Sequence, residues 1–342
     1  MPRATDNRGF SLIEVLIVIG IFSVLMAAVS VTFSTQVRHG SREYRVAESE
    51  VELGIVKNLL ERDIAMAGYG LADTYPPGPP VFSPRSVQRG SNTLILMGTA
   101  LGLNDRAPLH WTYASAAAPT FRVWGDSRED LLANDQVILI EPNTEQILTQ
   151  GGGTPWKFQY NSSSSLVDSG GTAWTNPTIG TLVYGVDPGA TQPFATVTYS
   201  LNAANLPSNC ATGTSNLERA ELWVVGGTPV TIPLLPCTLS LQTAFGLDTD
   251  EDENGTIDLW DNSTVAAGYS QATLAKRLKQ VRVYLLVQIG NRDASYTYPA
   301  ATVRVGDALL GAGTGADVTL NAEQRRFRWR LVSIDVTPRN VR

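Results

Sequence analysis

The stretch GFSLIEVLIVIGIFSVL, residues 9–25, contains one charged side chain, Glu14, in an otherwise uncharged and mostly apolar run. The run continues from Phe10 to Val31, and a helix over these 22 residues is about 33 Å long, enough to cross the hydrocarbon core of a bilayer. The preceding residues are polar and include Arg3 and Arg8, so the positive-inside rule keeps this end in the cytoplasm. The sequence therefore predicts one membrane-spanning segment, with the rest of the chain exported.

Three kinds of N-terminal segment fit this pattern. A secretory signal cleaved near Ala28 has suitable small residues, but the apolar run is longer than the usual signal core. A plain signal anchor leaves Glu14 unexplained, because a carboxylate inside the bilayer is costly. A prepilin-type leader accounts for the whole arrangement, since a short polar leader ends at Gly9 and is followed by Phe10 and then, four positions on, by Glu14.

The segment RGFSLIEVLIVIGI, residues 8–21, resembles the N-termini of type IV prepilins and of type II secretion pseudopilins. The resemblance implies that a prepilin peptidase cleaves between Gly9 and Phe10 and that Phe10 is then N-methylated. Cleavage leaves a charged amine that must be buried in a filament, where an unpaired charge is strongly disfavoured. We therefore expect Glu14 of one subunit to pair with the Phe10 amine of a neighbour during assembly.

A helical pattern continues beyond the membrane segment. Apolar residues at steps of seven or four form one stripe, namely Val37, Tyr44, Val51, Ile55 and Leu59. A second stripe of Leu53, Val56, Leu60 and Ile64 predicts wider burial in the C-terminal half. We expect a helix from residue 10 to residue 67, with a break near Gly40 as the alternative. The predicted organisation is a leader (1–9), a membrane or filament-core helix (10–31), an amphipathic continuation (32–67) and a head (68–342).

The head is predicted to be rich in β-structure, which gives an α+β fold of the type IV pilin kind. Short apolar runs predict strands at 93–97, 121–124, 136–140, 181–184, 194–201, 221–225, 229–234, 281–289, 301–305 and 327–336. Gly226 and Gly227 suit a tight hairpin turn, and residues 270–280 a short helix. The head could be one β domain or two lobes divided near Gly170.

Five segments of the chain together resemble the PilW group of large minor pilins. They are residues 59–70, 131–141, 245–260, 281–288 and 325–340. The resemblance implies a low-abundance subunit that helps to initiate a type IV pilus and sits at or near its tip. The implied partners are other minor and major pilins, the inner-membrane assembly platform, the prepilin peptidase and a PilY-type tip protein. The subunit would be an inner-membrane protein with a periplasmic head before assembly, and part of the extracellular pilus afterwards. The alternatives are a type II secretion pseudopilin and a tip-located adhesin or ligand-binding subunit.

The most specific candidate site is an acidic loop at residues 248–261, which holds seven acids and no base. Residues 250–261 fit the calcium-loop pattern D-x-D-x-N-G-x-I-D-x-x-D, in which alternating oxygens turn inward around a glycine. The predicted Ca²⁺ ligands are Asp250, Asp252, Asn254, Thr256 (through its carbonyl), Asp258 and Asp261, with Asp248 as a further candidate. An acidic solvated turn is the alternative, but such a cluster repels itself unless a cation is bound.

The remaining sequence features limit the kinds of function that the chain can have. The chain has 342 residues and a net charge of −6, which argues against a nucleic-acid-binding protein. Arginines alternate with aromatic residues at 325–330, and we interpret this as a strand rather than a nucleic-acid site. Cys210 and Cys237 lie in the exported part, where oxidising conditions favour a disulfide between them. No pattern for a nucleophile, a zinc site or a cofactor is present, so we expect no enzymatic activity.

Overall fold

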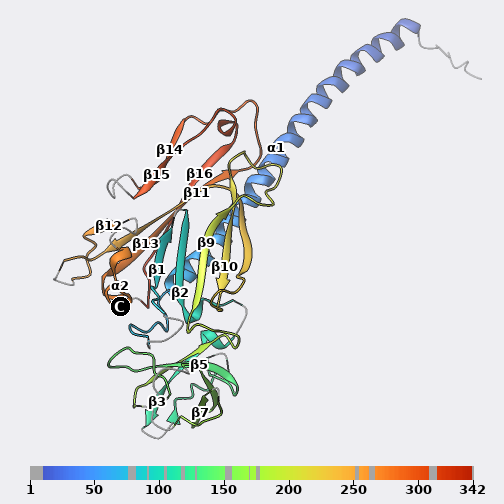
Figure 1. Cartoon of the computed structure of the whole chain (residues 1–342). Coiled ribbons are helices and arrows are strands. Elements are labelled where there is room, and N and C mark those ends of the chain that lie inside the picture. Colours follow the sequence, from blue (N-terminus) through green and yellow to red (C-terminus); the bar gives the residue numbers. More distant parts are fainter. Residues whose placement is uncertain are drawn as a thin grey trace, which may run out of the picture. The chain divides into compact units, whose positions relative to one another are not determined.

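The computed structural model describes residues 11–75, 82–90, 92–103, 106–116, 120–127, 129–150, 156–168, 170–174, 178–250, 254–261, 266–307 and 314–340. The chain divides into two compact units, Met1–Val51 and Glu52–Arg342. One helix, α1 (Leu12–Met66), belongs to both units and is followed by β-structure (Figure 1). The predicted α+β class, a long N-terminal helix followed by a β-rich head, is confirmed. The helix runs through Gly40 without interruption, so the structure has the single helix rather than the broken one.

The first unit contains the apolar part of α1 and the more polar turns that follow it up to Val51. The segment Leu12–Ser34 has a mean hydropathy of 2.8 and none of it is buried within the chain. Its length and composition are those of a membrane-spanning helix.

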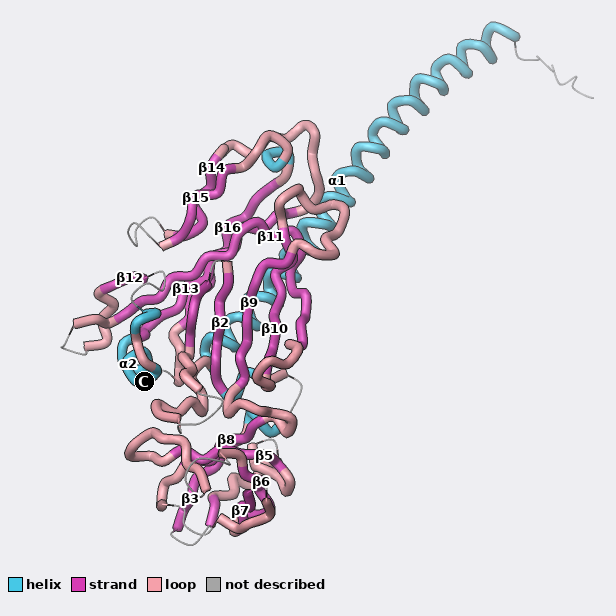
Figure 2. The backbone as a smooth tube through the Cα atoms, viewed as in Figure 1, coloured by secondary structure: helices cyan, strands magenta, loops and turns pink. Residues whose placement is uncertain are grey.

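The main sheet of the head has eight strands in the order β1-β2-β9-β10-β11-β13-β16, with β12 paired to β11 (Figure 2). All of its pairings are antiparallel. Its strands are β1 (Val87–Gly90), β2 (Thr93–Gly98), β9 (Ala195–Asn202), β10 (Ser215–Leu222), β11 (Val230–Leu247), β12 (Leu259–Asp261), β13 (Leu278–Ile289) and β16 (Arg328–Val336). A short helix, α2 (Gln271–Arg277), precedes β13, and the Ser270 side chain accepts a hydrogen bond from the Thr273 backbone as its N-cap.

The small lobe is a six-stranded sheet formed by a segment between β2 and β9. Its order is β4-β3-β8-β5-β6-β7. The strands are β3 (Trp111–Ala116), β4 (Thr120–Phe121), β5 (Asp135–Ile140), β6 (Phe158–Ser162), β7 (Ser165–Asp168) and β8 (Leu182–Val186). The small lobe is thus an insertion into the main sheet rather than one half of a head divided near Gly170. Its core includes Phe158, Leu166 and Val183, each fully buried.

The remaining elements are short. The hairpin of β14 (Thr302–Gly306) and β15 (Gly315–Thr319) forms a separate two-stranded sheet. The 3-10 helices are η1 (Thr99–Leu101), η2 (Ala107–Leu109), η3 (Ala266–Gly268) and η5 (Gln324–Arg326).

The C-terminal part of α1, residues 52–66, lies along one face of the main sheet (Figure 2). It buries the second predicted stripe, of which Leu53 is 7% exposed and Leu60 and Ile64 are completely buried. The first stripe remains in solvent, because Val51 is 65% and Ile55 is 61% exposed. The expectation of wider burial in this half of the helix was therefore wrong for these two residues: one face of α1 meets the sheet.

The opposite face of the main sheet has its own core. Tyr284 and Leu286 of β13 pack there with Val305 of β14 and with Phe327 and Trp329. Side chains alternate along a strand, so the neighbouring residues of β13 face α1 instead. The main sheet is therefore covered on both faces, which explains why β13 is almost continuously buried.

Two predicted strand boundaries need correction. The predicted strand at 121–124 ends at Phe121, because Trp124 belongs to a turn outside β4. The predicted hairpin around Gly226 is present, but β10 ends at Leu222 and β11 begins at Val230, so the connection is longer than a two-residue turn. Within it Gly226 adopts a φ of 69°, and the Gly227 N–H donates to the Val224 carbonyl at 2.9 Å.

Candidate functional site

The N-terminal processing site is described only in part. Gly9 and Phe10, between which cleavage is predicted, lie outside the described residues. Glu14 occupies the first turn of α1, and its Oε2 accepts a hydrogen bond from the Ser11 backbone N–H at 3.3 Å. A carboxylate at this position also suits the positive end of the helix dipole. In the sequence Glu14 lies four positions after Phe10, the predicted new N-terminus, and its pairing with a neighbouring subunit stays a prediction.

The acidic loop brings three of the predicted ligands together. Carboxylate oxygens of Asp248, Asp250 and Asp258 lie within 4.8 Å of one another. Backbone N–H groups hold the loop in shape: those of Thr249 and Asp250 donate to Asp258 Oδ2 at 3.0 and 3.3 Å, and that of Gly255 donates to Asp248 Oδ2 at 2.8 Å. Gly255 has a φ of 80°, a conformation that glycine adopts without strain. The carboxylates are therefore positioned by the backbone around one point.

Asp248 is the residue in this group that solvent reaches least. Its side chain is 3% exposed, and its Oδ1 has no hydrogen-bond partner among the described residues. Burying a carboxylate oxygen without a partner is costly, so the position favours a bound cation. Lys279 Nζ lies 3.7 Å from Asp248 Oδ2 and supplies part of the compensating charge. The oxygen donors and the unpartnered Oδ1 fit a Ca²⁺ ion.

The other predicted ligands have different positions. Asp261 lies on β12, opposite Phe245 of β11, and its Oδ2 accepts a hydrogen bond from the Ala266 N–H at 2.9 Å. It is not part of the group of three carboxylates. Asn254 Oδ1 accepts from the Thr256 N–H at 2.7 Å. Asp252 lies outside the described residues, so the loop pattern is tested geometrically only in part.

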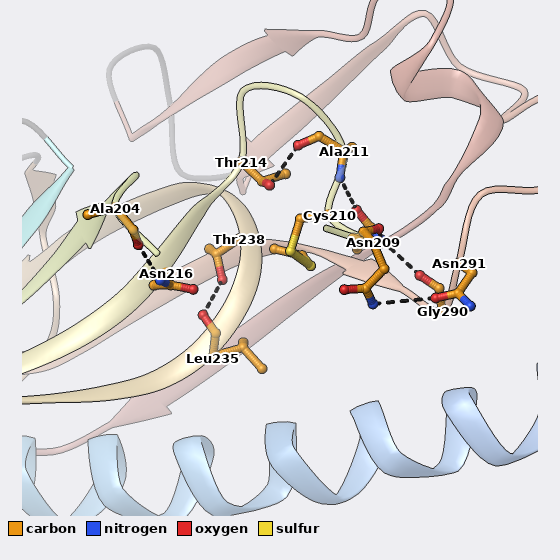
Figure 3. Close-up of a disulfide and its surroundings, with 12 residues drawn as sticks. Ala204, Asn209, Cys210, Ala211, Thr214, Asn216, Leu235, Thr238, Gly290 and Asn291 are labelled. Carbon is orange, nitrogen blue, oxygen red and sulfur yellow. Dashed lines mark hydrogen bonds between the residues drawn. A yellow bond between two sulfur atoms is a disulfide. The ribbon is translucent and has the colours of Figure 1, made fainter. Parts of the chain in front are cut away.

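The predicted disulfide is present between Cys210 and Cys237 (Figure 3). Their Cα atoms are 5.0 Å apart, a usual separation for a bridged pair. Cys237 lies in β11 where pairing passes from β10 to β13, and it adopts a φ of 55°. A bulged strand with a residue in this conformation is locally strained. The disulfide therefore fixes β11 at the point where it changes partners.

A buried charged cluster joins α1 to the main sheet, and the sequence reasoning missed it. Arg219 of β10 is completely buried, and its Nε donates to Asp63 Oδ2 of α1 at 2.7 Å. Its Nη1 donates to Glu221 Oε2 at 2.9 Å and its Nη2 to the Leu101 carbonyl at 2.5 Å. The Tyr199 hydroxyl donates to the same Asp63 oxygen at 2.7 Å. These bonds connect the helix, two strands and η1 through the Arg219 guanidinium and the Asp63 carboxylate.

The electrostatics of this cluster favour the charged arginine. Burial by itself lowers the pKa of Arg219, but Asp63 and Glu221 raise it, and the net shift is upward. Burial, reinforced by the charge of Asp63, also raises the pKa of Tyr199, so its hydroxyl stays protonated and remains a donor. Arg219 therefore stays positively charged beside its two carboxylate partners, and Tyr199 stays a hydrogen-bond donor to one of them.

A sequence signal for this cluster does exist. Leu217, Arg219 and Glu221 occupy alternate positions of one strand, so they share a face, and Leu217 is fully buried. On α1, Asp63 lies beside Ile64 and one turn after Leu60, within the buried stripe. Two opposite charges on inward-facing positions predict a buried pair. The predicted strand began at residue 221, however, so Leu217 and Arg219 lay outside it and their shared face was not recognised.

The arginines near the C-terminus hold a loop of the chain itself. Arg325 Nε donates to the Tyr298 carbonyl at 3.0 Å, and Arg326 Nη1 donates to the Ala294 carbonyl at 2.9 Å. Arg328 lies over the Tyr296 ring at 4.2 Å from its centroid. These contacts account for three of the four arginines as structural groups, in agreement with the interpretation of this segment as a strand and its approach.

Comparisons with known proteins support the reading of the N-terminus. The family model for the prokaryotic N-terminal methylation motif matches residues 5–30, a range that includes Gly9, Phe10 and Glu14. No curated protein matches the chain. Among solved structures, the type IV-like pilin TTHA1219 from Thermus thermophilus is similar with 10% identity and a TM-score of 0.35, over 86% of this chain and 98% of that one. A likeness at this score carries no argument, and the PilW resemblance stays a prediction. Residues 5–30 establish that the chain carries the N-terminal methylation motif of prokaryotic prepilin-type proteins.

Proposed function

We propose that this chain is a minor pilin, a low-abundance subunit that takes part in the initiation of a type IV pilus and sits at or near its tip. The observation that carries the proposal is the methylation motif at residues 5–30 at the start of a 55-residue helix, α1, that continues into a β-rich head. The segment Leu12–Ser34 is apolar and is not buried within its own chain, so it serves as a membrane anchor before assembly and as filament core afterwards.

Processing supplies the assembly signal in this proposal. Cleavage after Gly9 makes Phe10 the N-terminus, and its methylated amine is a cation that must enter an apolar filament. Glu14 is the one carboxylate in the first turns of α1, so it is the partner available to the amine of a neighbouring subunit. An ion pair at short range compensates for the cost of burying both charges. Subunits are therefore expected to assemble in the register that brings Glu14 of one subunit next to the Phe10 amine of its neighbour.

The size of the head supports a tip position over a position in the body of the filament. The small lobe is held by residues that follow α1, because Tyr69 packs edge-on against Tyr184 at 5.1 Å and the Asp73 N–H donates to the Glu145 carbonyl at 2.8 Å. A subunit in the body is contacted by neighbours on all sides, and an added lobe at the helix end obstructs the next subunit. A terminal subunit has no such restriction. The proposed neighbours are other pilins and a PilY-type tip protein.

We further propose that the acidic loop binds Ca²⁺ as a structural ion, held by Asp248, Asp250 and Asp258. Asp252, Asn254 and the Thr256 carbonyl are further ligands expected from the loop pattern, whose last predicted ligand, Asp261, lies outside the group of three carboxylates. The loop precedes β12 and is tied to α2, since Arg277 Nη1 donates to the Thr249 carbonyl at 2.7 Å. Binding there stiffens this part of the head after export, where calcium is plentiful.

Deletion of the gene, followed by imaging of surface filaments and an assay of protein secretion, tests the proposal. Loss or strong reduction of pili that is restored by the wild-type gene supports the minor pilin. Intact pili with blocked secretion indicate a type II secretion pseudopilin instead. Intact pili that no longer adhere indicate a tip-located adhesin.

A further inference from the structure

Three aromatic side chains form a group on the surface of the small lobe. Trp111 and Tyr113 lie on β3, and Trp124 lies in the turn after β4. The Trp111 ring centroid is 5.0 Å from that of Trp124 and 6.5 Å from that of Tyr113, and Tyr113 and Trp124 are 6.1 Å apart. All three side chains are partly exposed, and Val123 beside them is 51% exposed. We call Trp111, Tyr113 and Trp124 the aromatic platform.

The platform is separate from the hydrophobic core of its lobe. Side chains alternate along β3, and the alternate positions that follow its two rings, Thr112 and Ala114, are the buried ones. Ala114 belongs to the core cluster with Phe158, whereas none of the three platform rings does. Large aromatic surfaces left in water are unfavourable for a monomer, and a contiguous group of them marks a binding site.

The backbone holds the platform in a fixed arrangement. The indole N–H of Trp124 donates to the Trp111 carbonyl at 2.9 Å, which ties the two rings together. The backbone N–H groups of Trp124 and Gly125 donate to the two Asp130 carboxylate oxygens at 2.6 and 2.9 Å. Gly125 has a φ of 86°, a conformation that favours glycine. A rigid site loses little entropy when a ligand binds.

The platform also differs from three other partly exposed rings of the head. Trp260, Tyr269 and Tyr296 each have an arginine guanidinium over the ring, at 4.2, 5.5 and 4.2 Å from the centroid. Among the described residues, no such cation lies over Trp111, Tyr113 or Trp124. Their outward surfaces are therefore left for a ligand.

The geometry points to a neutral carbohydrate as that ligand, and we propose that the aromatic platform binds the apolar face of pyranose rings. The rings touch one another, so they form a continuous surface rather than a cage with room for a quaternary ammonium group. Three acidic residues, Asp126, Glu129 and Asp130, lie within six positions after Trp124. They outnumber the arginines of this segment, which include the exposed Arg122, so the local charge disfavours nucleic acids and anionic polysaccharides. The C–H groups of a pyranose face carry partial positive charge and suit the negative faces of aromatic rings.

This proposal does not depend on the assignment as a minor pilin, because it concerns the purified chain alone. The full chain is purified in a detergent without a sugar headgroup, so that the detergent does not compete. Cellohexaose, chitohexaose, mannohexaose and an anionic oligogalacturonate are titrated by calorimetry and by tryptophan fluorescence. The expected result is saturable binding of at least one neutral hexasaccharide and none of the anionic one.

Variants identify the site. Trp111→Ala and Trp124→Ala are each expected to lower the association constant roughly tenfold or more, which is the loss of about 1.4 kcal/mol of stacking. Trp111→Phe keeps a ring and the fold, and is expected to weaken binding by only about threefold. The matched control is Tyr296→Ala, a partly exposed ring whose face Arg328 already covers, and it is expected to bind as the wild type does. Melting temperatures verify that each variant is folded.

Several outcomes overturn the proposal. The platform does not bind neutral carbohydrate if no hexasaccharide binds, or if Tyr296→Ala weakens binding as much as Trp111→Ala. Binding of choline in place of the sugars identifies a cation site. If Trp111→Ala leaves sugar binding unchanged but removes copurifying pilins, the platform is a protein interface.

Discussion

Arg219 Nε lies 2.7 Å from Asp63 Oδ2, although the two residues are 156 positions apart in the chain. Both side chains are at most 1% exposed. This ion pair links α1 to the main sheet. It adds to the hydrophobic packing of Leu60 and Ile64, which are both completely buried. Because neither group can turn to solvent, each depends on the other for compensation.

Asp63→Asn is expected to destabilise the head by about 1.5–3 kcal/mol, because a neutral amide replaces the buried carboxylate that accepts from Arg219 and Tyr199. Glu221 still contacts Arg219 in this variant. The measurement is urea unfolding of the full chain in detergent, followed by tryptophan fluorescence. The matched control is Lys57→Ala, which removes the exposed pair with Glu61 at 3.7 Å and should cost less than about 1 kcal/mol. Equal effects of the two substitutions would show that the buried pair has no special role.

Asp73 makes stability depend on pH. Burial, together with the charge of Glu145 and a hydrogen bond that the protonated Asp73 carboxyl donates to it, raises the pKa of Asp73 to about 6 from an ordinary value of 3.8, while Lys276 acts in the opposite direction. The folded state therefore binds this proton more tightly than the unfolded state does. Stability from this group is present below about pH 4 and is lost as the pH rises to about 6.

Asp73→Asn is accordingly expected to raise the melting temperature at pH 7–8 and to flatten its change between about pH 4 and 6. Because Asp73 is partly exposed, solvent screening makes the gain smaller than the full pKa shift implies. The control is Asp187→Asn, an aspartate of the small lobe away from the Asp73–Glu145 contact, which should not alter that part of the curve. A curve for Asp73→Asn parallel to that of the wild type from pH 4 to 8 would contradict this account.

Calcium is expected to stabilise the head through the acidic loop. With a dissociation constant on the order of 10⁻³ M, 10 mM CaCl₂ contributes about 1.4 kcal/mol, which raises the melting temperature by about 2–4 °C. Asp248→Asn should abolish the rise, because it removes the buried charge of the site. Asp250→Ala combined with Asp252→Ala should do the same.

Asp261→Asn distinguishes the sequence-based ligand set from the group that the structure brings together. The asparagine keeps an oxygen for the Ala266 N–H, so the fold of β12 should be preserved. If Asp248, Asp250 and Asp258 hold the ion, Asp261→Asn retains the calcium-dependent rise. If Asp261→Asn loses the calcium-dependent rise in melting temperature, Asp261 is a ligand after all, as the twelfth position of the loop pattern predicts. If calcium does not raise the melting temperature of the wild type, the calcium proposal is wrong.

Reduction of the Cys210–Cys237 bridge is expected to lower the free energy of unfolding by roughly 3–4 kcal/mol, from the loop of 27 residues that it closes. The Cys210→Ser, Cys237→Ser double variant should unfold at lower urea and become insensitive to reductant. Non-reducing digestion and mass spectrometry of the wild type should recover the linked peptides. Free thiols in the exported head would contradict the assignment.

Glu14→Ala is expected to leave cleavage after Gly9 intact but to reduce entry of the subunit into filaments severalfold, since the methylated amine of a neighbour loses its partner. The measurement compares mature chain in the membrane with chain in sheared pili. Ser23→Ala, a change within the same apolar segment, is the control and should assemble normally. Normal incorporation of Glu14→Ala would remove the proposed role.

Much of the architecture follows from local patterns. The long helix and most of the strands in the main sheet were predicted near their positions, because hydrophobic period and turn residues act over short distances. The strand at 121–124 was predicted too long, since Trp124 lies outside β4, is partly exposed and contributes to the aromatic platform rather than to β-structure. The face of α1 that carries Val51 and Ile55 was also misread, because helical period alone does not say which of two apolar stripes meets a sheet.

By itself, the sequence determined the membrane-length helix, the register of Gly9, Phe10 and Glu14, and the acidic loop, because each is a contiguous segment whose chemistry depends on spacing. Only the tertiary structure decided that Arg219 meets Asp63, that Asp248 rather than Asp261 joins Asp250 and Asp258, and that the small lobe is an insertion. These are contacts between distant parts of the chain. They depend on which strands pair and on which faces are buried, and packing of the whole head sets both.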